Sequence, residues 1–233
     1  RSIRYCLRHP KMFRRQLRAI LRASAIGPVR IMFPLVTSAT ELRDARIHLE
    51  NAMEELRERD EPFDADVKVG MMVEVPSAAV MASTFAKLVD FFSIGTNDLV
   101  QYTLAVDRTN ERVADLYTAA HPAVVRLVKD VIRAGRRRDI DVSLCGEAAG
   151  GPRYTMLLIG LGLRTLSVTP SRIPFLKRVI RGVEIAECER LARTVGSFDS
   201  QGQIDTYLLD QTRKRFPELV DGRFVDTGDR EPQ

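Results

Sequence analysis

The segment VDFFSIGTNDLVQYTLAVDR, residues 89–108, decides the fold class because it joins a buried strand to a group of polar side chains. The run from Phe91 to Ile94 is short and apolar on both faces, which is typical of a parallel strand covered by helices. Gly95 and Thr96 follow this run, then come Asn97 and Asp98, and Arg108 ends the segment. Residues in this position lie on the carboxyl side of a parallel sheet, where α/β domains place their sites.

Four further apolar runs resemble this strand, and amphipathic segments lie between them. Strands are predicted at 29–36, 67–75, 89–95, 141–146 and 164–168. Helices are predicted at 11–24, 40–57, 77–87, 122–135, 152–160, 173–181, 184–194 and 202–215, with a frayed polar tail at 217–233. This alternation predicts an α/β fold with a parallel sheet. Five strands fit a doubly wound sheet, whereas a closed (βα)8 barrel needs eight, so the pattern leaves both open.

Composition narrows the class of protein. The chain has 233 residues, 45% of them hydrophobic and 29% charged, which is ordinary for a globular protein. No apolar run approaches the ~20 residues needed to cross a bilayer, and the N-terminal residues do not form a signal peptide. The three cysteines are an odd number at unrelated spacings. We therefore expect a cytoplasmic protein with reduced thiols and no membrane insertion.

The first thirty residues hold eight arginines, one lysine and no acid. One interpretation is an arm that binds nucleic acid. A second is an amphipathic helix at 11–24 whose basic side chains are solvated. Its apolar face would consist of Met12, Phe13, Leu17, Ile20 and Leu21. No aromatic residues interleave with the charges as single-strand stacking requires, so we expect no nucleic-acid partner. A basic rim that attracts a small anionic substrate is a third interpretation.

Several predicted strands end in reactive side chains. Glu74 ends one, Asn97 and Asp98 follow the next, and Cys145 and Glu147 end a third. In a parallel sheet these groups converge on one edge. Two carboxylates are enough protein ligands for Mg²⁺, which fills its other positions with water and substrate phosphate oxygens. The sequence therefore predicts a magnesium site at this edge.

Each of these residues also has a purely structural interpretation. Glu74 could cap the helix that Pro76 opens, and Asp98 could be a turn or N-cap residue. Cys145 could be an inert buried thiol. Arg108 could pair with a neighbouring aspartate, and His121 could serve only as the entry to a helix. These alternatives remain open at this level.

These groups could bind and act on a phosphorylated carboxylic acid: they are two carboxylates, an amide, an arginine and a thiol. The arginine can bind a phosphate or carboxylate through two hydrogen bonds. A metal ion can neutralise charge on a phosphoryl group in transfer. A thiol can donate a proton to a carbanion.

The segment at 89–108 closely resembles the phosphoenolpyruvate-binding domain of Enzyme I, the phosphoenolpyruvate–protein phosphotransferase of the bacterial sugar phosphotransferase system. The resemblance covers about residues 1–182. It includes the motifs RIMFPLVTSATELRDAR, VGMMVEVPSAAVMA, LYTAAHPAVVRLVKDVI, VSLCGEAAGG and LLIGLGLRTLSVTPSRIP, in the family's order. Pyruvate phosphate dikinase and phosphoenolpyruvate synthase share related segments and are the alternative enzymes. A non-catalytic remnant kept for dimerisation or binding is a further alternative.

The resemblance implies a role for each matching residue. Glu74 and Asp98 are implied to bind Mg²⁺, and Cys145 to protonate the enolate of pyruvate. Asn97, Asp98, Arg108 and Arg1 are implied to bind the substrate. The family passes the phosphoryl group to a histidine of a separate N-terminal domain and on to the histidine-containing phosphocarrier protein. A homodimer is also implied.

The resemblance implies an incomplete (βα)8 TIM barrel that contains about the last five strand–helix units. It divides the chain into a partial barrel at 1–182, C-terminal helices that pack on the barrel at 183–216 and a polar tail at 217–233. On this view the chain is a piece of a larger enzyme. Two positions beside Cys145 depart from the family pattern. Gly151 stands where an acid is common, and Ala148 where a larger apolar residue is common.

Overall fold

The computed structural model describes residues 1–220 except 108, 111, 114 and 115. Within this part of the chain, five short strands form one parallel sheet in the order β1-β2-β3-β4-β5. The strands are β1 (Arg30–Phe33), β2 (Lys68–Val73), β3 (Phe91–Gly95), β4 (Asp141–Cys145) and β5 (Thr165–Leu166). Each lies inside its predicted range, so all five predicted strands are confirmed.

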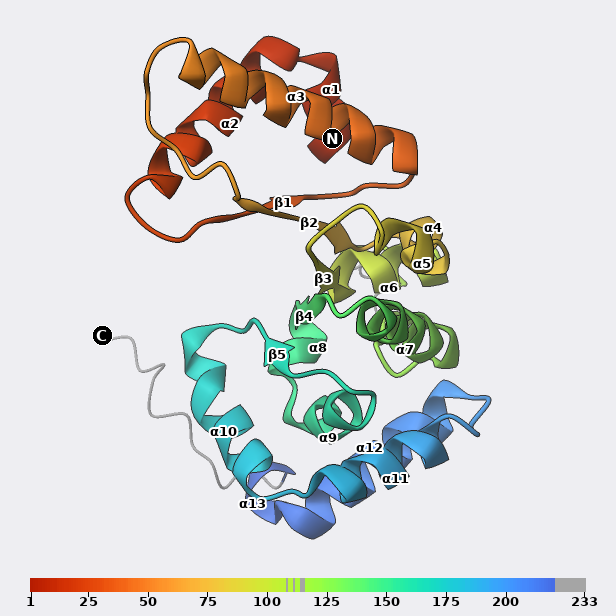
Figure 1. The fold of residues 1–233 in the computed structure, drawn as a ribbon. Helices are drawn as coiled ribbons and strands as arrows, with labels where there is room; N and C mark the ends of the chain where they lie inside the picture. The colour runs from red at the N-terminus through yellow and green to blue at the C-terminus, as the bar shows by residue number, and fades with distance from the viewer. Residues whose placement is uncertain (108, 111, 114–115, 221–233) are drawn as a thin grey trace, which may run out of the picture.

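The strand order distinguishes the two candidate architectures. Sheet neighbours are also neighbours in the sequence, and every pair is parallel. Crossovers between parallel strands are right-handed, so an order that never reverses places all connecting helices on one face. A doubly wound sheet would require a reversal. Figure 1 shows the strands along an arc with the helices outside it. The prediction of consecutive units of a (βα) barrel is confirmed.

An ion pair across the sheet gives independent evidence of this curvature. The guanidinium of Arg30 on β1 lies 2.8 Å from Asp141 on β4 and 4.3 Å from the ring centroid of Phe91 on β3. In a flat sheet, strands three places apart would be about 14 Å apart. Curvature brings the two side chains within reach of each other, on the side of the sheet that faces away from the helices.

The helices are described in chain order. They are α1 (Ser2–Arg8), α2 (Pro10–Ser24), α3 (Ala39–Arg57), α4 (Pro76–Val80), α5 (Ala82–Phe85), α6 (Thr96–Leu104), α7 (Pro122–Arg137), α8 (Glu147–Gly150), α9 (Pro152–Gly160), α10 (Ile173–Arg181), α11 (Ile185–Val195), α12 (Gln201–Arg215) and α13 (Pro217–Val220). A 3₁₀ turn, η2 (Pro170–Arg172), precedes α10. Serine N-caps with complete capping boxes fix the starts of α3 and α12.

Several helix predictions need correction. The helix predicted at 77–87 is two short helices, α4 and α5, separated at Met81. Gly135 does not end α7 but lies within it, because the missing Cβ lets the helix pack closely against Val142 of β4. The predicted frayed tail is helical at Pro217–Val220, and its remainder lies outside the described residues.

The two faces of the sheet differ in chemistry. On the helix-covered face Phe92 aligns with Met71 of β2 and Val142 of β4, and this side is apolar. On the opposite face Ser93 aligns with Met72 and Ser143. That face carries Arg30, Lys68, Ser93, Asp141, Ser143 and Cys145. The core therefore lies between sheet and helices, whereas polar groups line the inside of the arc.

The basic N-terminal segment packs on α3 through ion pairs. Arg4 binds Glu41, Arg14 and Arg18 both bind Glu55, and Arg22 binds Glu61 just beyond the helix. Phe13, Leu17 and Leu21 are buried as predicted. Met12 is exposed, so its placement on the buried face was wrong. These acidic partners account for much of the basic charge of the first thirty residues.

Phe92 anchors the core because it lies in the middle of the sheet and is fully buried. We expect Phe92→Ala to lower the free energy of unfolding by about 4 kcal/mol, through lost transfer energy and the cavity left behind. Urea denaturation followed by circular dichroism measures this loss. Phe63→Ala is the control, since Phe63 is only half-buried, and should cost less than half as much. Equal losses for the two variants would contradict the position assigned to Phe92.

Candidate active site

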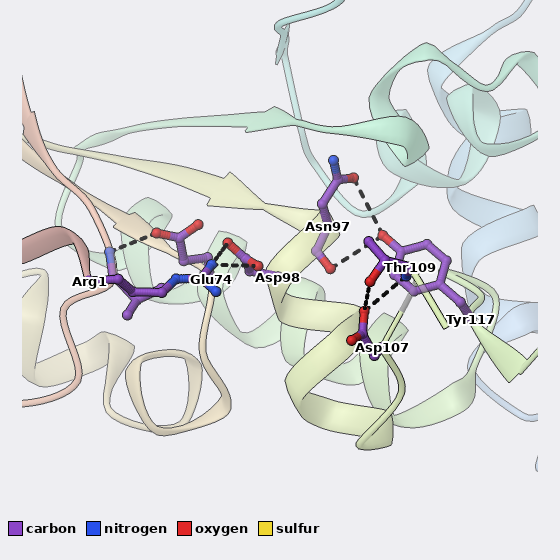
Figure 2. A network of polar contacts seen from close by, with 8 residues as sticks. Arg1, Glu74, Asn97, Asp98, Asp107, Thr109 and Tyr117 are labelled. Carbon is purple, nitrogen blue, oxygen red and sulfur yellow. Dashed lines mark hydrogen bonds and ion pairs between the residues drawn. The ribbon is translucent and has the colours of Figure 1, made fainter. Parts of the chain in front are cut away.

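The structure brings the predicted site residues to one end of the sheet. Glu74 directly follows β2, Asp98 lies in the first turn of α6 after β3, and Cys145 ends β4. These are the carboxyl ends of three adjacent parallel strands. Arg108 lies outside the described residues. The side chain of Arg1, at the start of the chain, donates a hydrogen bond to Asp98 (Figure 2).

Glu74 is buried, and its carboxylate has a backbone hydrogen-bond partner. Its carboxylate accepts a 2.7 Å hydrogen bond from the backbone N–H of Leu35, and only 6% of the residue is exposed. Leu35 has φ 52°, an uncommon conformation for leucine. A Cβ on Gly95 would lie 2.9 Å from the Cβ of Glu74, so only glycine leaves room there. Val75 rather than Glu74 is the N-cap of α4, so the capping interpretation is wrong.

Asp98 completes a pair of carboxylates with Glu74. Asp98 is the third residue of α6, and Gly95 rather than Asp98 is its N-cap. Both of its carboxylate oxygens accept hydrogen bonds from Arg1, at 3.2 and 3.3 Å. Burial raises the pKa of Glu74, and the nearby Asp98 carboxylate raises it further. Such a pair of acids favours either a shared proton or a bound cation.

The raised pKa of Glu74 predicts that the charged carboxylate, which a metal site needs, lowers the free energy of unfolding. The folded protein holds the Glu74 proton more tightly than the unfolded chain, whose ordinary pKa is 4.5. Without a cation, stability therefore falls as pH rises from that value through the raised pKa. We expect Glu74→Gln, which keeps an acceptor for Leu35, to raise the free energy of unfolding at pH 8 by about 1 kcal/mol. The gain should shrink at pH 5.

Urea titrations in a chelating buffer at the two pH values measure this effect. Glu50→Gln provides the control, because Glu50 is exposed on α3 and should change stability little at either pH. A Glu74→Gln variant that is less stable than the wild type at pH 8 would show that the Glu74 charge is well compensated, contrary to this account.

Asn97 lies beside the carboxylate pair and has its own hydrogen-bond network. Its side-chain Oδ1 accepts the backbone N–H of Glu147 at 2.9 Å. The Tyr117 hydroxyl donates to the backbone carbonyl of Asn97 at 3.3 Å and to Oδ1 at 3.4 Å (Figure 2). A backbone N–H can only donate, so the amide oxygen must face Glu147. Among residues 1–220 as the structure describes them, no hydrogen bond is formed by the amide nitrogen, which is a donor.

Cys145 is half-buried and lines a cavity of about 560 Å³. The cavity is lined by Asn97, Cys145, Gly146, Glu147, Gly150, Gly151, Pro152, Ser167, Val168, Thr169 and Arg172. The Ser93 hydroxyl donates a hydrogen bond to Sγ at 3.9 Å. Burial raises the pKa of the Cys145 thiol, with a smaller contribution from Glu74. The group is therefore protonated at neutral pH, and it can act as an acid rather than as a thiolate nucleophile.

The sequence did not point to Tyr117, Ser93 or Arg172 as parts of this site. Ser93 had a signal, because it is the polar residue in the apolar run FFSIG and its side chain faces the inside of the arc. Tyr117 and Arg172 had none, since each reaches the site through the fold. His121 was interpreted as a helix-entry residue, and this is confirmed: its Nδ1 accepts the N–H of Ala123 at the N-cap of α7.

Comparison with known proteins identifies the class to which this fold and site belong. The family "PEP-utilising enzyme, PEP-binding domain" matches residues 1–185, so the chain belongs to that family. It is 46% identical over 205 residues to the phosphoenolpyruvate-protein phosphotransferase of Haemophilus influenzae, covering 88% of this chain and 36% of that protein. It is 45% identical over 207 residues to the phosphotransferase of Cupriavidus necator, covering 87% and 35%.

A solved structure supports the fold alone. A citrate lyase from Burkholderia xenovorans LB400 superposes with a TM-score of 0.53 at 17% identity, covering 91% of this chain and 73% of that one. The chain spans about a third of the length of the curated relatives it matches. Within the described residues, no helix combines the length and the apolar character needed to span a membrane.

Proposed function

We propose that this chain is the phosphoenolpyruvate- and Mg²⁺-binding part of a phosphoenolpyruvate–protein phosphotransferase. The observation that carries the proposal is the pairing of Glu74 and Asp98 at adjacent strand ends, with Cys145 at the next. Relatives at 45–46% identity carry the phosphotransferase name, which favours this enzyme over a dikinase or phosphoenolpyruvate synthase. Intact site residues speak against a non-catalytic remnant.

The residues present fit a magnesium ion. Glu74 and Asp98 supply hard oxygen ligands. Burial, and then the neighbouring Asp98 carboxylate, raise the pKa of Glu74, and a bound cation would compensate the charge of the pair. Among the described residues no group of three or more His, Cys, Asp or Glu side chains could hold a metal. Two carboxylates are nevertheless sufficient for Mg²⁺ when substrate phosphate completes its coordination. When bound, the ion neutralises negative charge on the phosphoryl oxygens.

The other side chains bind the substrate and move its proton. Arg1 donates hydrogen bonds to Asp98. Arg1 and Arg108 are both proposed to bind an anionic group of the substrate beside the cation. The amide nitrogen of Asn97 donates to a phosphoryl oxygen. The P–O bond to the enol oxygen breaks as a bond forms to a histidine nitrogen, and its electron pair yields the enolate. The Cys145 thiol then gives its proton to the methylene carbon, which produces pyruvate, and the thiolate is reprotonated from water.

The remaining parts of the reaction involve partners. The histidine is proposed to belong to a separate N-terminal domain and to pass the phosphoryl group to a histidine-containing phosphocarrier protein in the cytoplasm, as a step of sugar transport. A homodimer is also proposed. Within this chain, residues 1–182 are proposed as the partial barrel domain, with 183–216 packed on it. The absent Cβ of Gly160 in α9 supports this packing, because the backbone of Cys188 in α11 lies against it.

A partial reaction tests the proposal without the histidine. Pyruvate incubated with the chain and Mg²⁺ in deuterated water should lose its methyl proton signal, because Cys145 exchanges a proton with the enolate carbon. Proton magnetic resonance follows the exchange over time. We expect exchange above the protein-free rate only when Mg²⁺ is present. Equal exchange with a chelator would argue against the metal-dependent assignment.

A further inference from the structure

A cavity of about 290 Å³ lies outside the arc of strands, where α4 and α5 pack against α7 (Figure 1). One wall belongs to α7, and the other is formed by residues on both sides of the helix break at Met81. The lining consists of Ala79, Val80, Ala82, Ser83, Leu127, Asp130, Arg133 and Arg137. Apart from Val80, the residues opposite α7 are alanine or serine, and these small side chains leave the space between the helices open.

Two arginines of α7 supply positive charge to this cavity. Arg133 and Arg137 are four residues apart, so their side chains lie on the same face of the helix. Both residues are exposed, and neither forms an ion pair within the described part of the chain. Arg14 and Arg18 of α2, in contrast, both bind Glu55. Like charges one turn apart repel each other, and an anion bound between them would compensate this repulsion.

The cavity also contains hydrogen-bond acceptors. Asp130 lies three residues before Arg133, and among the described residues it forms no ion pair with either arginine. A charged carboxylate can only accept hydrogen bonds, whereas the hydroxyl of Ser83 can donate or accept. Asp130 therefore opposes a bare anion and favours a ligand that carries hydroxyl groups beside its negative charge.

We propose that Arg133 and Arg137 bind the phosphoryl group of a small phosphate ester, whose hydroxyl groups donate hydrogen bonds to Asp130. A phosphate monoester carries about two negative charges near pH 7 and has three terminal oxygens, so it can bind both guanidinium groups at once. A single carboxylate has one charge and two oxygens. As the structure describes them, the linings of this cavity and of the cavity at Cys145 share no residue, so this site is independent of the proposed function.

The test is a calorimetric titration of the full chain, without Mg²⁺, with glycerol 3-phosphate and separately with methyl phosphate. We expect saturable binding of glycerol 3-phosphate, weakened at least about tenfold in Arg133→Gln/Arg137→Gln, because charge-assisted hydrogen bonds are lost. Arg126→Gln/Arg136→Gln is the matched control. It removes the same charge from exposed positions of α7 outside the cavity lining and should bind like the wild type.

Two further comparisons test the role of the hydroxyl groups. Methyl phosphate lacks hydroxyl groups and should bind more weakly than glycerol 3-phosphate. Asp130→Ala removes the acceptor from an exposed position of α7 and should abolish this difference. Methyl phosphate that binds the wild type as tightly as glycerol 3-phosphate would overturn the assignment of a hydroxyl-bearing ligand.

Three other outcomes would overturn the site itself. One is the absence of glycerol 3-phosphate binding to the folded wild type. Another is equal weakening in the two double variants, which would show attraction to the basic face of α7 in general. The third uses Arg1→Gln, which alters the proposed active site. Binding that is lost in this variant but retained in Arg133→Gln/Arg137→Gln would mean that the anion binds beside Asp98 instead.

Discussion

Asp98→Ala should abolish the magnesium dependence of phosphoenolpyruvate binding. The substitution removes one of two carboxylates at the proposed metal site and leaves Glu74 without its neighbour. Since Mg²⁺ here would have so few protein ligands, losing one should weaken metal-dependent binding at least about 100-fold. Arg1 would also lose its acceptor on α6. Titration of the variant with phosphoenolpyruvate at saturating Mg²⁺ measures the loss.

Asp44→Ala is the matched control for this experiment. Asp44 is an exposed aspartate on α3. It should bind substrate with the same magnesium dependence as the wild type. Retained magnesium-dependent binding in Asp98→Ala would exclude Asp98 as a ligand and leave its carboxylate only a structural role with Arg1.

Cys145→Ala should slow the magnesium-dependent exchange of pyruvate methyl protons by about 10²–10⁴-fold, the usual contribution of a positioned general acid or base. Substrate affinity should remain close to that of the wild type, because the thiol is assigned proton transfer rather than binding. The half-buried position and raised pKa of the thiol support this separation of roles. Parallel exchange and calorimetric measurements on one preparation distinguish a chemical defect from a binding defect.

Cys6→Ala controls for the loss of a thiol in general. Cys6 is also half-buried but lies in α1, away from the cavity. Exchange should proceed normally in that variant. Exchange at the wild-type rate in Cys145→Ala would identify the thiol as a packing residue and move the proton donor to another group in the cavity.

The sequence predicted the fold where local patterns determine structure. All five strands were predicted because parallel strands in a covered sheet are short, apolar runs. Their ends were less predictable: β5 retains only two residues, Thr165 and Leu166, of a predicted five-residue run. The break between α4 and α5 at Met81 had no sequence signal, since the residues around it are compatible with one helix.

The site was predictable for residues at strand ends and unpredictable for those brought in by tertiary contacts. Glu74 and Asp98 follow apolar runs, so their convergence follows from a parallel sheet. Arg1 reaches Asp98 across 97 positions of sequence, and periodicity cannot reveal such a contact. The backbone N–H of Leu35 binds Glu74, and Leu35 has a positive φ; nothing in its residue type indicates either feature. The pattern of strand ends predicted the magnesium site of Glu74 and Asp98, whereas the substrate-binding role of Arg1 came from resemblance to a known family.

The central claim is that Glu74 and Asp98 hold a cation which in turn helps to bind phosphoenolpyruvate. Calorimetric titration of phosphoenolpyruvate into the chain, with Mg²⁺ and again with a chelator, tests it most directly. The account predicts saturable heat with Mg²⁺ and at least about tenfold weaker binding without it. Equal binding under both conditions, or no binding with Mg²⁺ to a chain shown by circular dichroism to be folded, would contradict the claim.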